Sequence, residues 1–186
     1  MHDRHVRVGI ADHLGWAVVV TANAAHEVVD RRRIELVEPD VNPMPVHHGI
    51  EDLDDAAAVT LIAEVRASAV RATAEALDDL VAEVPSPVTS MFLRVIPPDF
   101  PQDISVVRQV PWEARADAVM YREVLAEAAA ARGWAVLHYE AKSVEAQAAG
   151  MLGGRADEVL HGPRARLGPP WAKDHRTALA ATIVGG

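Results

Sequence analysis

The chain has 186 residues, of which 50% are hydrophobic and 24% charged, and its formal net charge is −9. These values predict a single folded domain over residues 1–186, with enough apolar side chains to form a core. The lack of cysteine excludes disulfides, thiolate catalysis and cysteine-ligated metal sites. The acidic balance argues against a broad nucleic-acid-binding surface, because neutralising phosphates requires positive charge.

The first forty residues predict three antiparallel strands, over residues 6–11, 16–22 and 26–37, joined by short polar turns. The first strand ends at Asp12, and the chain then turns through Gly15. In α/β sheets the carboxyl end of a strand is the usual place for a metal or phosphate site. Asp12 is therefore the first candidate site residue, and the alternative is a turn aspartate that accepts hydrogen bonds from its own backbone.

The rest of the chain predicts alternating helices and strands. Apolar residues at spacings of three and four, Val59, Val70 and Val81 among them, predict the buried face of a long helix. Asp117 and Arg122 are interpreted as surface-pairing residues of a later helix. The expected elements are a Pro- and His-rich loop (39–49), helices (51–84, 112–132, 143–152, 157–160, 177–184), strands (88–96, 134–139) and a loop or short turn (101–110).

This order of elements resembles the ribonuclease H-like superfamily, which includes the Holliday-junction resolvases. Three stretches carry the resemblance, namely the hairpin GIADHLGWAV (9–18), the junction AAAARGWAV (128–136) and the segment DHRTALAA (174–181). The resemblance implies an α/β fold with a ribonuclease H-like mixed five-stranded sheet, three antiparallel strands followed by strand–helix alternation, flanked by helices.

The resemblance also implies a metal-dependent site. Asp12 and Asp174 would bind magnesium, which activates water for phosphodiester hydrolysis, and His175 would move a proton. Three cations would contact phosphates and one aromatic ring would stack on a base; these are Lys173, Arg176, Arg164 and Trp171. The structural alternatives are an N-cap role for Asp174 and a packed Trp171 that fixes its loop.

Two departures from the resolvase pattern leave the function open. Thr177 stands where the pattern has an aspartate, and the strand that ordinarily ends in the second acid carries Arg94 and no acid. One hypothesis is therefore a magnesium-dependent, resolvase-like nuclease acting on nucleic acid. The other is a non-catalytic binding or scaffolding domain on the same fold, which forms homo-oligomers through its Ala-rich helices.

The remaining expectations concern histidines and location. The adjacent His47 and His48, together with His13 and His175, could form an imidazole-rich metal site or an acid–base pair, although their spacing matches no zinc motif. The alternative is that they lie in solvent. No apolar run approaches the roughly 18 residues that a membrane span needs, and the start lacks the apolar core of a signal peptide. A cytoplasmic protein without membrane contact is expected.

Overall fold

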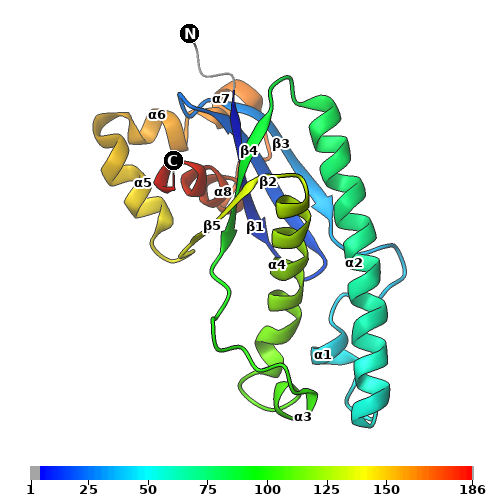
Figure 1. Ribbon diagram of the computed structural model, residues 1–186. Helices are drawn as coiled ribbons and strands as arrows, with labels where there is room; N and C mark the ends of the chain where they lie inside the picture. The colour runs from blue at the N-terminus through cyan, green and yellow to red at the C-terminus, as the bar shows by residue number, and fades with distance from the viewer. Residues whose placement is uncertain (1–4, 186) are drawn as a thin grey trace.

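The computed structural model describes residues 5–185 and has a five-stranded mixed sheet at its centre, with helices on both faces (Figure 1). The strand order is β3-β2-β1-β4-β5. Strands β1 (Val6–Asp12), β2 (Trp16–Asn23) and β3 (Val28–Glu35) are antiparallel, and β4 (Val88–Arg94) and β5 (Ala135–Tyr139) run parallel to β1. The mixed five-stranded sheet predicted from the sequence is confirmed.

Two groups of helices enclose the sheet (Figure 1). Helices α2 (Asp55–Glu83) and α4 (Glu113–Ala131) cover one face, and α5 (Val144–Leu152), α6 (Ala156–Leu160) and α8 (Lys173–Val184) cover the other. The remaining helices are one turn long, α1 (Pro45–His48), α3 (Ile104–Val107), the 3₁₀ turn η1 (Gly153–Arg155) and α7 (Pro163–Leu167). Three of these, α1, α3 and α7, lie where the sequence predicts no helix.

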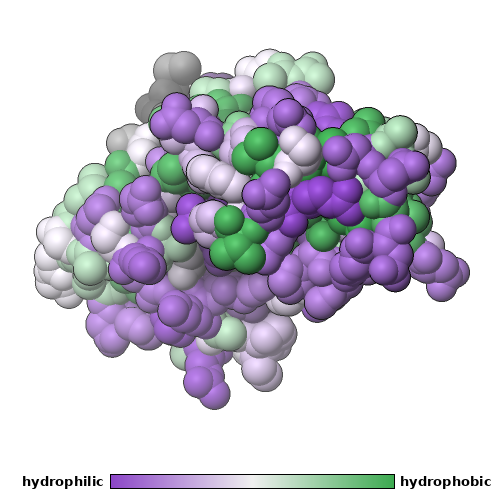
Figure 2. Space-filling view, turned by 90° about the horizontal axis from the view of Figure 1, so that it is seen from below, coloured by the Kyte–Doolittle hydropathy of each residue, from purple (hydrophilic) through white to green (hydrophobic). Residues whose placement is uncertain are grey.

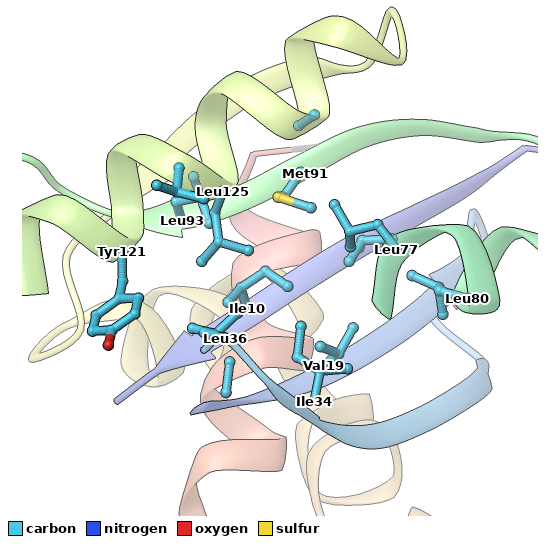
Figure 3. Close-up of a cluster of buried hydrophobic side chains, with 14 of the residues drawn as sticks. Ile10, Val19, Ile34, Leu36, Leu77, Leu80, Met91, Leu93, Tyr121 and Leu125 are labelled. Carbon is cyan, nitrogen blue, oxygen red and sulfur yellow. The ribbon is translucent and has the colours of Figure 1, made fainter. Parts of the chain in front are cut away.

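The side chains of β1 alternate between the two faces of the sheet, as the pleat requires. Val8 joins the core under α2 and α4, as does Ile10 (Figure 3), whereas Ala11 belongs to the core under α8. Gly9 also faces α8, and a Cβ atom there would overlap the carbonyl oxygen of Ala178. The glycine in β1 therefore allows α8 to lie directly against the sheet.

The long helices begin at different residues from those predicted. Asp54 caps α2, since its carboxylate accepts a hydrogen bond of 2.8 Å from the backbone N–H of Ala57. Helix α8 begins at Lys173, four residues before the predicted start, and its N-cap is Ala172. Asp174 therefore lies within the first turn of α8, and the N-cap interpretation of this residue is wrong.

The apolar pattern of α2 matches its burial only in part, since Leu77 is fully buried and Ile62 and Ala74 are half-buried. Val59, Val70 and Val81 are 52%, 41% and 48% exposed, although the sequence predicts them in the buried face. They are spaced by eleven residues, or three turns of helix, so they share one side of α2. We call this side the α2 stripe; it also contains the exposed alanines Ala56, Ala63 and Ala67.

Among residues 5–185 no helix has the combination of length and apolar character needed to cross a lipid bilayer.

Candidate strand-end site

Asp12 is held in a buried cluster with two arginines. Because side chains alternate along β1, Asp12 follows Val8 and Ile10 toward the α4 side of the sheet. Its Oδ2 accepts a hydrogen bond of 2.8 Å from Nε of Arg122 on α4, and its Oδ1 lies 3.6 Å from Nε of Arg94 at the end of β4. Asp12 is only 2% exposed, so this carboxylate is enclosed by guanidinium groups.

The arginines also connect the cluster to the neighbouring strand ends. Arg122 donates a second hydrogen bond, of 3.1 Å, to the carbonyl oxygen of Val95 just after β4. On β5, the Tyr139 hydroxyl donates to the carbonyl oxygen of Ile10 at 2.7 Å. Burial raises the pKa of Tyr139 to about 12, with the Asp12 charge adding to the rise and the Arg94 and Arg122 charges opposing it. Tyr139 is therefore a neutral hydrogen-bond donor at neutral pH.

Asp174 pairs with a different residue of the opening hairpin. Its Oδ2 lies 2.9 Å from Nε2 of His13, in the turn after β1. The His13 ring stacks on Trp16 with centroids 4.0 Å apart and planes within 8°, and the Arg33 guanidinium packs 4.0 Å from the centre of the Trp16 ring. The hairpin and the first turn of α8 do meet, but through His13 and not through Asp12.

These contacts do not fit the predicted magnesium ion. A magnesium site needs carboxylate oxygens that can face the cation, together with room for its waters. Both Asp12 oxygens face arginine side chains. Oδ1 accepts no hydrogen bond and faces Nε of Arg94, which likewise has no hydrogen-bond partner in the described chain. Asp174 is engaged by His13, and residues 5–185 contain no group of three or more His, Asp or Glu side chains arranged to hold a metal.

His175 is buried and caps α8. The backbone N–H of Ala172 donates to its Nδ1 at 3.2 Å, and the residue is 7% exposed. Its ring lies 5.4 Å from that of Trp171. Burial, aided by the Arg31 charge, lowers the pKa of His175, while Asp174 opposes this shift. The proton transfer expected of His175 stays a prediction, since its Nδ1 already serves the helix terminus.

The lowered pKa of His175 predicts a loss of stability in acid. Between the lowered pKa of the folded chain and the ordinary value of about 6.5, the His175 imidazole is protonated in the unfolded chain but neutral in the folded chain. The free energy of unfolding therefore falls as the pH drops through this range. We expect wild type to lose more stability between pH 7.5 and pH 5.5 than His175→Gln, measured by urea unfolding. Equal losses in both proteins would contradict this expectation.

The residues predicted to contact substrate differ in their burial and in their ion-pair partners. Arg176 pairs with Glu145 at 3.2 Å, whereas Lys173 and Arg164 are exposed and form no ion pair within residues 5–185. Trp171 is 6% exposed, and its Nε1–H donates to the carbonyl oxygen of Leu160 at 2.8 Å. Its buried ring therefore presents no open face for a base, and the packed alternative describes it.

The loop before Trp171 is held by Arg31 of β3. The guanidinium donates to the carbonyl oxygens of Leu167, at 2.7 Å, and Gly168, at 2.8 Å, and also to those of Pro169 and Pro170. One arginine thus binds four successive backbone carbonyls. This contact positions the start of α8 and, with it, Asp174.

His47 and His48 lie on α1, with ring centroids 4.3 Å apart. His48 is 3.8 Å from Glu51, and both side chains are 59% exposed. Neither belongs to a group suited to metal within the described part of the chain. Figure 2 looks onto this end of the molecule, where α1 and α3 lie, and hydrophilic side chains cover most of the face with small hydrophobic patches between them.

Sequence reasoning missed the pairing role of Arg94, Arg122 and His13. Arg122 was interpreted as a surface residue, but its side chain is 17% exposed and bound to Asp12. The sequence contained a signal for this pairing, because Asp12 lies two residues after Ile10 and four after Val8, so its side chain is on the same face of β1. That face is covered by a helix, where a carboxylate needs a cationic partner.

Comparison with solved structures assigns the fold to the ribonuclease H-like class. A structure of Thermus thermophilus RuvC matches with a TM-score of 0.53 and 12% sequence identity over 96% of this chain and 91% of that one. A second, T. thermophilus RuvC in complex with Holliday junction substrate, matches with a TM-score of 0.50 and 14% identity over 97% of this chain and 91% of that one. No protein-family model matches the chain, and no curated protein sequence matches it significantly.

Proposed function

We propose that this chain is a non-catalytic, RuvC-like domain that binds nucleic-acid phosphate and does not hydrolyse it. The observation that carries the proposal is the enclosure of Asp12 by Arg94 and Arg122. Metal-dependent hydrolysis needs a cation that activates water and stabilises the leaving oxygen. In this cluster the cationic charge belongs to fixed side chains, which can bind an anion but cannot generate hydroxide from water.

The charges around the cluster support a phosphate contact. Two guanidinium groups face one carboxylate, so the trio carries one net positive charge in a protein of net charge −9. The side chains of Arg94 and Arg122 are 24% and 17% exposed. Lys173 adds an exposed cation near the hairpin, at the first turn of α8. The likeness to RuvC in complex with a Holliday junction suggests branched DNA as the first ligand to test.

The test combines binding and cleavage on one labelled four-way DNA junction. We expect fluorescence anisotropy to give the same affinity in EDTA and in Mg²⁺ at matched ionic strength, with no cleavage product. Arg94→Gln should weaken binding and make its salt dependence shallower by about one unit of log–log slope. Arg71→Gln is the matched control, because Arg71 is exposed on α2 and pairs with Glu38.

Two outcomes would overturn the proposal. Magnesium-dependent cleavage by wild type that is lost in Asp12→Asn would establish the nuclease hypothesis instead. Equal binding by wild type, Arg94→Gln and Arg71→Gln, or no binding at low salt, would remove the phosphate contact.

The α2 stripe supports the homo-oligomer predicted from the sequence. Its valines and alanines form a long strip of exposed apolar side chains on a 29-residue helix, and a second copy of the same strip would cover it symmetrically. We expect light scattering after gel filtration to give a dimer for wild type and a monomer for Val70→Asp. Val110→Asp is the control, because Val110 is 82% exposed and lies outside α2. A monomeric wild type, or the same effect from both variants, would contradict self-association through α2.

A further inference from the structure

A second polar cavity lies at the opposite end of β1 from Asp12. The antiparallel register pairs Asp12 with Ala17 but Val6 with Asn23, so the β2–β3 turn is at the far end of the sheet. Between this turn and helices α6 and α7 is a cavity of about 300 Å³. Its charged lining consists of His26 and Glu27 from the turn, Arg155 and Glu158 from the η1–α6 segment and Arg166 from α7.

The turn holds His26 in a rare backbone conformation. The Asn23 side chain accepts hydrogen bonds from the backbone N–H groups of Ala25 and Glu27, both at 3.0 Å, and donates to the Glu27 carboxylate at 2.8 Å. His26 has φ of 67°, in the left-handed region that non-glycine residues seldom occupy. The Asn23 hydrogen bonds therefore fix the turn that places His26 in the cavity lining.

Two arginines of the lining and the His26 imidazole have polar atoms without a partner in the described chain. Nδ1 of His26 is buried and has no hydrogen-bond partner in the described chain. Arg155 and Arg166 form no ion pair or side-chain hydrogen bond within residues 5–185, although both share this cavity with glutamates. Burial lowers the pKa of His26, and the charges of Arg7 and Arg155 lower it further. The lining thus combines two arginines that have no ion-pair partner in the described chain with two glutamates, next to an imidazole on which the Arg7 and Arg155 charges act.

From this arrangement we propose that the cavity binds a small phosphorylated molecule. The phosphate would be bound by Arg155 and Arg166, whose planar guanidinium groups suit its oxygens, and by the His26 ring. The volume lies at the lower end of the range for small-molecule sites and exceeds what a bare phosphate fills. Glu27 and Glu158 would accept hydrogen bonds from hydroxyl groups of the ligand, and the same acids disfavour a long polyanion.

The test uses calorimetric titration of the full chain with ribose 5-phosphate, inorganic phosphate and a short single-stranded oligonucleotide. We expect ribose 5-phosphate to bind at least tenfold more tightly than inorganic phosphate, and the oligonucleotide not to compete for this site. Arg155→Gln and Arg166→Gln should each weaken binding at least tenfold. His26→Asn, which tolerates the left-handed conformation, should also weaken it. Arg164→Gln is the matched control, since Arg164 is exposed on α7 but does not line the cavity.

The outcomes separate this proposal from the strand-end function. No binding of either phosphate at millimolar concentration, or equal loss in Arg164→Gln and Arg166→Gln, would overturn it. Competition by the oligonucleotide would assign the arginines to a nucleic-acid surface and would also overturn it. Arg94→Gln should leave ribose 5-phosphate binding unchanged, because Arg94 lies at the other end of the sheet. Failure of junction binding therefore has no bearing on the cavity.

Discussion

Replacing Asp12 by alanine is expected to lower the free energy of unfolding by about 3–5 kcal/mol, the range for breaking a buried ion pair. The reason is that Arg122 and Arg94 would be left partly buried without the carboxylate that neutralises them. The loss should be seen as a lower midpoint in urea unfolding, with little change in the slope of the transition. Glu38→Gln is the comparison, because it breaks an exposed pair with Arg71 and should cost far less than Asp12→Ala.

A double variant tests whether the cost comes from unpaired charge. Asp12→Val combined with Arg122→Met removes both partners, and it should recover a large part of the stability lost in Asp12→Ala. Magnesium should not stabilise wild type, because an ion that bound only the folded chain would raise its stability with concentration. An Asp12→Ala cost below about 1 kcal/mol, or stabilisation by magnesium that Asp12→Asn abolishes, would contradict the arginine-enclosed cluster.

The sheet could be predicted because its signals are local. Strands β1 and β2 are rich in β-branched residues and are joined by a short turn, in which Gly15 has φ of 83°, a value that a glycine adopts freely. The short helices could not be predicted, since one turn is too short to show helical periodicity. Helix α1 depends on a residue about 70 positions away, because Asp117 on α4 accepts hydrogen bonds from the N–H groups of Val46 and His47.

Sequence reasoning identified the two segments of the candidate site but not the charged partners of its acids. The sequence located Asp12 and Asp174 at the hairpin and the start of α8, and these segments do meet through His13. The partners of Asp12 lie 82 and 110 positions along the chain, so no local pattern could reveal them. The missing acid at the end of β4 was visible in the sequence. The contact between Arg94 and Asp12 depends on the parallel pairing of β4 with β1, which no local pattern in the sequence shows.

Asp117 gives the second large expected effect. It is 2% exposed, and its carboxylate accepts hydrogen bonds of 3.0 Å and 3.1 Å from the first turn of α1. The surface-pairing interpretation of this residue is therefore wrong. Asp117→Ala removes two hydrogen bonds to a charged group and leaves buried N–H donors unsatisfied, so we expect a loss of about 2–4 kcal/mol in the free energy of unfolding. Asp103→Ala is the control, because Asp103 forms similar bonds with Ser105 in an exposed loop.

The pH dependence of Asp117 separates its charge from its packing. Burial raises the pKa of Asp117, and the two backbone hydrogen bonds, with the charges of His47 and His48, only partly offset this rise. A carboxyl with a raised pKa favours the folded state while protonated, so its contribution is lost as the pH climbs from about 4 through the folded pKa. The free energy of unfolding of Asp117→Asn should therefore rise relative to that of wild type as the pH increases through this range. A difference that stays constant with pH would show that the loss comes from packing alone, because an uncharged amide fills the same space without titrating.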